Sequence, residues 1–331
     1  MKKYFVCLFI LVIISACSQK NAEETTPVIV AYVTSWTDDP VDPTYITHIN
    51  YSFAHVTDEF NGVRIDNEDR MRMVLKLKEK KPELKVLLCI GGWTSGRFSE
   101  MAANESYRKA FAIDCKRVVN QYGFDGIDLN WEYPTVSDAG ISSSPDDTDN
   151  YTLLVHDIRN EIGKDKLLTM ASDYTGKYFD FKSIEPYLDF VNIMNYDTGE
   201  PPYHNAGLYR SEHTKDLSVD ESVIEHINLG LPPQKLVLGI PFGGKGLRGV
   251  RFSNAHIQEG YTQEWDDVAK AAYLADADGK FIHTYEEPRA IALKCEYLRS
   301  KGLLGAMYWS YSGDDTGILR KAVFDGVMEG R

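Results

Sequence analysis

Short apolar segments rich in β-branched and aromatic residues recur along the chain, and stretches with a helical pattern separate them. Eight of these segments predict strands, at residues 28–33, 48–54, 85–90, 124–131, 166–171, 190–196, 236–242 and 305–311. Helical patterns between them cover residues 68–80, 106–122, 150–162, 219–229 and 289–301. Eight strands in alternation with helices are typical of a (β/α)8 TIM barrel, so we expect an α/β protein with a single barrel domain.

The main competing fold is a doubly wound open sheet. No Gly-x-Gly-x-x-Gly sequence follows the first predicted strand, so a dinucleotide site loses its main support and no cofactor is expected. A chain of 331 residues, 43% of them hydrophobic, can bury one barrel-sized core. Residues 243–283 form the longest interval between strands. We expect a small elaboration there, between the seventh and eighth strands, and no second domain.

The charge balance and the cysteines exclude several kinds of site. A net charge of -13 without a run of lysine and arginine disfavours nucleic acid as a partner, because binding phosphates needs a basic surface. Beyond the N-terminal segment, Cys89, Cys115 and Cys295 are widely spaced and odd in number, so they predict no disulfide framework. Neither cysteines nor histidines have the spacing of metal ligands, so we expect core cysteines and no metal site.

The first residues have the layout of an export signal. Two lysines precede an apolar run that is too short to span a bilayer, and Ser-Ala-Cys follows it. This ending resembles a bacterial lipoprotein signal, so we expect a signal peptide at 1–16, a lipid anchor on Cys17, a polar tether at 18–26 and the barrel at 27–331. The expected location is the cell envelope, periplasmic or surface, with membrane contact through the lipid alone. The alternative is cleavage near Ala16 and secretion of a free protein.

The segment 124–134 reads Phe-Asp-Gly-Ile-Asp-Leu-Asn-Trp-Glu-Tyr-Pro and carries a row of polar groups. Side chains alternate along a strand, so Asp128, Asn130 and Glu132 share one face, opposite an apolar face. Acids placed together inside a fold repel each other and lose hydration, which pushes at least one pKa upward. Such a site supplies a carboxylic acid that is still protonated near neutral pH, as protonating a poor leaving group requires.

Residues 125–132 resemble the Asp-x-x-Asp-x-Asp-x-Glu signature of glycoside hydrolase family 18, the chitinases and their relatives. Further matches follow in the order of that family along the chain. They are Tyr32 and Trp36 at the first strand, Phe53 at the second, 88–93 at the third, 194–197 at the sixth, 239–242 at the seventh and 305–309 at the eighth. Matches at the ends of seven strands in register argue against chance.

The resemblance implies retaining hydrolysis of β-1,4-linked N-acetylglucosamine oligomers, in which the acetamido oxygen of the sugar attacks the anomeric carbon. It makes Glu132 the general acid and then the base, places Asp128 and Asn130 beside it, and lets Tyr196 orient the acetamido group. It assigns substrate contacts to Tyr32, Phe53, Trp93, Met194, Asp197 and Trp309, with Trp309 as the floor under the reacting sugar. The implied partner is chitin or a related oligosaccharide, and we expect a monomer that needs no cofactor.

Three residues depart from the family pattern. Asn130 stands where the family has an aspartate, so it brings no negative charge to stabilise the cationic intermediate. It also removes a charge that would raise the pKa of Glu132, which leaves burial and Asp128 to keep that acid protonated. We therefore predict an enzyme slower than an aspartate version, with a more acidic optimum. Cys89 replaces a serine and removes a strong hydrogen bond, and Gly243 replaces a tyrosine and indicates a shallow cleft.

Two other functions remain open on the sequence. One is an endo-β-N-acetylglucosaminidase that cuts the core of N-glycans. The other is a weakly active or non-catalytic carbohydrate-binding barrel, with Asn130 as the mark of lost catalysis. For Asp125, whose strand parity differs from that of Asp128, we expect a structural hydrogen bond at the strand start. For Glu286 and Glu287 we expect favourable electrostatics at the start of a helix.

Overall fold

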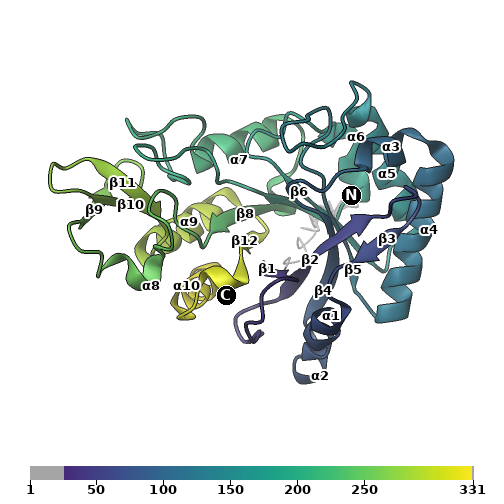
Figure 1. Ribbon diagram of the computed structural model, residues 1–331, viewed down its shortest axis with the longest axis horizontal. Coiled ribbons are helices and arrows are strands. Elements are labelled where there is room, and N and C mark those ends of the chain that lie inside the picture. Colours follow the sequence, from purple (N-terminus) through teal and green to yellow (C-terminus); the bar gives the residue numbers. More distant parts are fainter. Residues whose placement is uncertain (1–25, 330–331) are drawn as a thin grey trace, which may run out of the picture.

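Parallel strands that close on themselves form the centre of the protein (Figure 1). The computed structural model describes residues 26–329. Within them, eight parallel strands close into a barrel, in which β12 pairs with β1. The order is β1 Val28–Thr34, β2 His48–Val56, β4 Lys85–Gly91, β5 Gly126–Asn130, β6 Leu167–Ser172, β7 Phe190–Ile193, β8 Leu236–Pro241 and β12 Gly305–Trp309. The expected α/β barrel is confirmed.

The barrel strands all run in one direction, so their carboxyl ends meet at one end of the barrel, where enzymes of this architecture carry their sites. β1 begins at Val28 at the opposite end and reaches the carboxyl end at Thr34. A short strand, β3 Val63–Ile65, pairs antiparallel with the extended end of β2. The signal peptide, Cys17 and most of the tether lie outside the described residues.

Four barrel strands are shorter than the sequence predicts, and two of them, β5 and β7, lead into the site. β5 ends at Asn130 and β7 ends at Ile193. After β7 the backbone N–H of Asn195 bonds to the carbonyl of Ile193 at 2.9 Å, and that of Tyr196 bonds to the carbonyl of Met194 at 2.7 Å. These bonds over two residues turn the chain out of the sheet ladder. Glu132, Tyr196 and Asp197 therefore lie in loops above the barrel mouth.

Helices surround the barrel, and their bounds are α1 Glu68–Leu75, α2 Leu77–Lys80, α3 Phe98–Ala103, α4 Glu105–Tyr122, α5 Asp147–Ile162, α6 Phe181–Ile184, α7 Val219–Asn228, α9 Pro288–Lys301 and α10 Ile318–Met328. Short 3-10 turns occupy Glu185–Tyr187, Pro233–Lys235 and Tyr311–Gly313. The helix predicted at 68–80 is divided into α1 and α2 at Lys76. In the described part of the chain, no helix is both long and apolar enough to cross a membrane.

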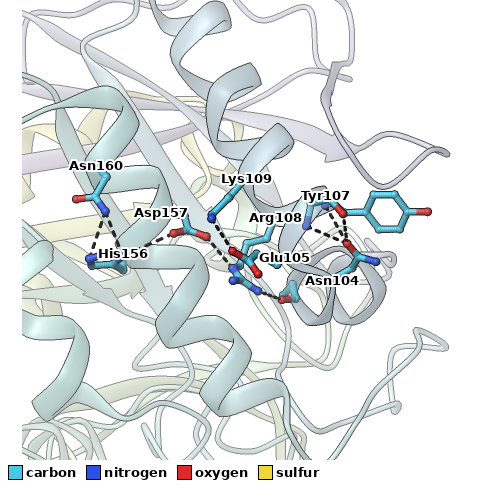
Figure 2. A network of polar contacts seen from close by, with 10 residues as sticks. Asn104, Glu105, Tyr107, Arg108, Lys109, His156, Asp157 and Asn160 are labelled. Atoms are coloured by element: carbon cyan, nitrogen blue, oxygen red, sulfur yellow. Dashed lines mark hydrogen bonds and ion pairs between the residues drawn. The ribbon is translucent and has the colours of Figure 1, made fainter.

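A polar network ties α3, α4 and α5 together (Figure 2). The Asn104 side chain accepts the N–H groups of residues 106 and 107 and so caps α4. Arg108 on α4 donates to Asp157 on α5 at 2.7 Å and to the carbonyl of Ala102 on α3 at 2.8 Å. Arg108 is buried, so the pair is shielded from solvent and fixes how these helices pack. α4 ends at Tyr122, and the left-handed backbone of its C-cap residue, Gly123, turns the chain toward β5.

The interval between β8 and β12 holds a short helix, α8 Phe252–Ala255, and an antiparallel sheet of β9 Thr262–Asp266, β10 Ala271–Ala275 and β11 Phe281–Tyr285. Val250, Leu274 and Tyr285 belong to a small apolar cluster inside it. Figure 1 places this sheet at the end of the molecule away from α4 and α5. The expected elaboration between the seventh and eighth barrel strands is present.

Of two acidic residues for which the sequence predicted a structural role, Asp125 has the predicted role and Glu286 does not. Asp125 accepts the N–H of Val86 at 2.8 Å and pairs with Lys78 at 2.7 Å, which is the structural role expected at the strand start. The expectation for Glu286 is wrong, because this side chain is buried and pairs with Lys294, which is buried too. Burial raises the pKa of Glu286, and the ammonium of Lys294 opposes that rise.

Candidate active site

Asp128 forms the polar centre of the barrel. The strand register places it between Cys89 on β4 and Thr169 on β6, and its side chain is fully buried. Thr169 donates to one of its oxygens at 2.5 Å and Asn192 on β7 donates to the same oxygen at 3.1 Å. The Tyr32 hydroxyl on β1 donates to the other oxygen at 3.0 Å. Burial raises the pKa of Asp128, and the hydrogen bonds from Thr169, Cys89 and Tyr32 oppose that rise.

Glu132 lies just beyond the end of β5, yet it meets the polar face of that strand. The amide nitrogen of Asn130 donates to Glu132 Oε1 at 3.0 Å. Between them Trp131 points the other way and is buried, with its ring stacked on Phe98 at 5.3 Å. The alternation inferred from the sequence therefore extends past the strand and leaves the carboxyl of Glu132 above the barrel interior.

The carboxyl of Glu132 has a pKa raised from 4.5 to about 7. Burial is the largest cause, the hydrogen bond from Asn130 opposes it, and the negative charge of Asp197 adds to the rise. The sequence interpretation named Asp128 as the charge that helps to keep this acid protonated. The charge that the structure adds is Asp197, in the loop after β7, while the carboxylate of Asp128 is held within the barrel by donors from Thr169, Asn192 and Tyr32.

The raised pKa of Glu132 makes stability depend on pH. Between pH 4.5 and about 7 the folded protein holds a proton that the unfolded chain has released, so this contribution is complete below pH 4.5 and is lost as pH rises through about 7. Glu132→Gln removes the titrating group. We expect the free energy of unfolding of the variant, minus that of wild type, to be larger at pH 8 than at pH 5. Urea unfolding at the two pH values measures this difference. Equal differences at both pH values would contradict the assignment.

The loop after β7 brings Tyr196 and Asp197 to the same place. Burial raises the pKa of the Tyr196 hydroxyl, and the charges of Asp197 and Glu132 raise it further. Asn195 points outward, where it donates to Ser222 on α7 at 2.7 Å and accepts the N–H of Gly239 on β8 at 3.1 Å. These bonds fasten the loop to two neighbouring elements and fix the position of Tyr196.

The backbone of Asp197 is left-handed, with φ of 62°. Its N–H donates to the side chain of Asn205 at 2.9 Å, and its carboxylate pairs with Lys245 at 2.7 Å. Asp197 is exposed at the mouth, with 62% of its side chain accessible. Met194, the first residue after β7, is almost completely buried. The sequence did not predict that Lys245 pairs with Asp197, because the two residues lie 48 positions apart along the chain.

A group of aromatic rings surrounds Trp309 at the end of β12. Phe53 stacks on Trp309 with ring centres 5.7 Å apart, and Tyr32 meets it edge-on at 5.9 Å. Trp36 lies 6.3 Å from Trp309 and remains 62% exposed. Tyr32 differs from its expected role, because its ring is buried and its hydroxyl bonds to Asp128, so it supports Trp309 from below. Trp309 and Trp36 present flat apolar faces to solvent, as binding pyranose rings requires.

A second aromatic group lies beside Glu132. Trp93 on the loop after β4 is 55% exposed and meets Tyr133 edge-on at 6.5 Å. Tyr133 in turn stacks on Tyr178, from the loop after β6, at 5.0 Å. The sequence analysis did not assign Tyr178 to the site, because a single tyrosine in a loop does not indicate which ring it stacks on.

Asp147 is a further residue that the sequence analysis missed. It is the first residue of α5 and is fully buried. One of its oxygens accepts the hydroxyl of Ser99 at 2.7 Å, and the other accepts the N–H groups of Thr135 at 3.2 Å and Ser144 at 2.7 Å. It therefore fixes both ends of the loop that follows Glu132. The only signal was its place in a loop rich in serine, threonine and aspartate.

The candidate site is made of carboxyl, amide, hydroxyl and aromatic groups. Within residues 26–329, no group of three or more His, Cys, Asp or Glu side chains is arranged to hold a metal ion. Cys89, Cys115 and Cys295 are free and buried, as expected of core residues. The geometry can hold a proton on Glu132, orient a polar substituent with Tyr196 and stack sugar rings on Trp309.

Comparison with known proteins agrees with this geometry. The sequence profile described as glycosyl hydrolases family 18 matches residues 28–314. Chitinase A1 of Niallia circulans is 30% identical over 86% of this chain, and the match covers 55% of that protein. The chain thus spans about half the length of that curated relative.

Solved structures resemble the barrel closely. A family 18 N-acetylglucosaminidase from Paenibacillus barengoltzii superposes with a TM-score of 0.83 and 31% identity. The match covers 91% of this chain and 100% of the other. A cell-surface chitinase from Paenibacillus sp. str. FPU-7 gives a TM-score of 0.82 and 31% identity over 91% of this chain and 43% of that one.

Proposed function

Because the chain belongs to glycoside hydrolase family 18, we propose that it hydrolyses β-1,4-linked N-acetylglucosamine oligomers with Glu132 as general acid and then base. The observation that carries the proposal is the pKa of Glu132, raised to about 7 in a carboxyl that Asn130 orients and Asp197 faces. A carboxyl with that pKa is protonated often enough at neutral pH to donate its proton to the leaving oxygen.

The reaction proceeds by substrate assistance. The acetamido oxygen of the sugar attacks the anomeric carbon while Glu132 gives its proton to the glycosidic oxygen, and the bond to the leaving sugar breaks. Tyr196 donates its hydroxyl hydrogen to the acetamido carbonyl and holds it in line. Glu132, now ionised, takes a proton from water, and that water opens the cyclic intermediate with net retention. Trp309 forms the apolar floor under the reacting sugar.

The test is hydrolysis of chitotetraose by protein that lacks residues 1–20, with the product anomer followed by NMR from the first minutes. We expect the β-anomer to be released first and to mutarotate later. Early release of the α-anomer would overturn substrate-assisted retention. Binding without turnover would favour the carbohydrate-binding alternative.

A second candidate function concerns which bond is cut. The full-length similarity to an N-acetylglucosaminidase structure favours removal of single sugars from a chain end. Analysis of the first products from chitotetraose separates the two modes, because end attack releases monomer and trimer, whereas internal attack releases dimer. A parallel digestion of a high-mannose glycoprotein tests the glycan-core alternative.

Asn130→Asp tests why this chain departs from the family pattern. In wild type the Asn130 amide donates to Glu132 and lowers its pKa. Aspartate would replace that donor with a charge, raise the pKa of Glu132 and stabilise the cationic intermediate. We expect kcat to rise by about tenfold, the size of effect that one charge contact to the intermediate has. We also expect activity to fall off at a higher pH than in wild type. If Asn130→Asp is no faster at any pH, this interpretation of Asn130 is wrong.

The lipid anchor is a separate proposal that rests on the sequence around Cys17. Detergent phase partitioning of the full chain and of Cys17→Ser tests it directly. We expect wild type in the detergent phase and the variant in the aqueous phase. Equal partitioning of the two would support ordinary secretion.

A further inference from the structure

The loop that joins β4 to α3 touches the site at several points. The N–H of Gly92 donates to the carbonyl of Asn130 at 2.8 Å. A Cβ at Gly92 would lie 2.6 Å from the Phe53 ring, so the loop passes between these two site residues with no space to spare. The next residue, Trp93, exposes its ring at the mouth, and Asn130, which Gly92 holds, donates to Glu132 at 3.0 Å. A small displacement of this loop therefore changes the surroundings of Glu132.

A line of polar contacts fastens this loop to the neighbouring strands. Ser95 Oγ lies 2.8 Å from His55 Nδ1, on β2. His55 Nε2 lies 3.0 Å from Asp66 Oδ2, just after β3. Tyr51 on β2 donates to the backbone carbonyl of Asp66 at 3.0 Å and holds that residue in place. The contacts join three segments that are far apart in the sequence.

Burial favours the neutral form of the His55 ring. Burial lowers its pKa, the charge of Asp66 raises it, and Arg64 and Arg97 lower it again. A neutral imidazole donates through one nitrogen and accepts through the other. The contacts fit a proton on Nε2, which donates to the Asp66 carboxylate, while Nδ1 accepts the hydroxyl hydrogen of Ser95.

The order Asp66, His55 and Ser95 is that of the catalytic triad in serine hydrolases. Only 7% of Ser95 is exposed, so a substrate carbonyl has no approach to its Oγ. In such a triad the histidine takes the proton of a hydroxyl that faces the substrate. Here the hydroxyl faces into the protein, which indicates a structural brace.

We propose that His55 is a positioning residue for hydrolysis, which holds the β4–α3 loop through Ser95 so that Gly92 keeps its bond to Asn130, the donor to Glu132, and the Trp93 ring stays at the mouth. The inference rests on the proposed role of Glu132. It concerns features of this chain outside the family signature, since His55 and Ser95 belong to none of the matched motifs.

Four variants separate the contacts. Ser95→Ala removes the hydroxyl. In His55→Asn the side-chain amide occupies the place of Nδ1 and can still bond to Ser95, whereas in His55→Gln the amide occupies the place of Nε2 and keeps only the contact with Asp66. Thr47→Val is the matched control, because Thr47 Oγ1 bonds to His48 Nδ1 at 2.8 Å at the opposite end of the barrel.

The measurements are the pH profile of kcat/KM on chitotetraose and hydrogen exchange of the amides at 92–95. For Ser95→Ala and His55→Gln we expect faster exchange, KM raised about threefold, and an alkaline limit about half a pH unit higher, because a looser loop no longer holds Asn130, whose amide donates to Glu132. His55→Asn should resemble wild type in all three. Thr47→Val should lower stability without moving the pH limit.

The outcomes distinguish the two proposals. If wild type does not hydrolyse chitotetraose, the proposed function fails, while the exchange data still report whether His55 holds the loop. If Ser95→Ala lowers stability as Thr47→Val does but leaves the exchange at 92–95 and the pH limit unchanged, His55 has only a structural role and the inference is overturned. The same holds if His55→Asn and His55→Gln behave alike.

Discussion

Glu132→Gln is expected to lower kcat on chitotetraose by about 10²–10⁴-fold, the contribution typical of a positioned general acid. Glutamine has nearly the same shape and can still contact Asn130, but it has no proton to give to the leaving oxygen. The barrel mouth keeps Trp309 and Trp93, so binding of the oligosaccharide should change little. Initial rates and isothermal calorimetry on the same preparation separate the two effects.

The control for this prediction is Glu287→Gln. Glu287 begins α9 as its N-cap residue, and burial raises its pKa as it does that of Glu132. It takes no part in the proposed chemistry, so this variant should keep the wild-type rate. If Glu132→Gln retained more than a tenth of the wild-type kcat, another group would have to be the acid.

Asp128→Ala is expected to cost about 3–5 kcal/mol of unfolding free energy, because three buried donors lose their acceptor at once. The hydroxyls of Tyr32 and Thr169 and the amide of Asn192 all point at this carboxylate inside the barrel. Water cannot replace it easily at a position with no exposed surface. Urea unfolding with fitted m-values measures the loss.

Tyr32→Phe provides the matched comparison. Alone it removes one donor and should cost about 1 kcal/mol. In the Asp128→Ala background the same change removes a hydroxyl that is already unpaired, so its cost should vanish or change sign. Additive losses in the double variant would contradict the contacts described for Asp128.

The sequence predicted the barrel and the polar row because both depend on local periodicity. Alternation along β5 was enough to place Asp128 and Asn130 together and to bury Trp131. The resemblance to family 18 assigned Trp309 and Phe53 to the substrate site, and parallel strands do bring their carboxyl ends to one place. These inferences needed no knowledge of side-chain contacts.

Other parts of the site depend on contacts between distant segments, which periodicity does not report. Asp197 faces Glu132 because the chain turns after Ile193, and Lys245 reaches Asp197 from the elaboration after β8. The buried pair of Glu286 and Lys294 likewise looks like an ordinary helix start in the sequence. Each depends on how loops of different strands are placed above the mouth.

The direction of β1 determines how an anchored molecule would be oriented. The strand takes seven residues from Val28 to Thr34, so about 23 Å separates the entry of the chain from the catalytic end at about 3.3 Å per residue. A lipid on Cys17 would hold the protein by its base, and the nine residues of the tether could add at most about 30 Å of standoff. The mouth would then open away from the bilayer, toward polymer that arrives from the surroundings.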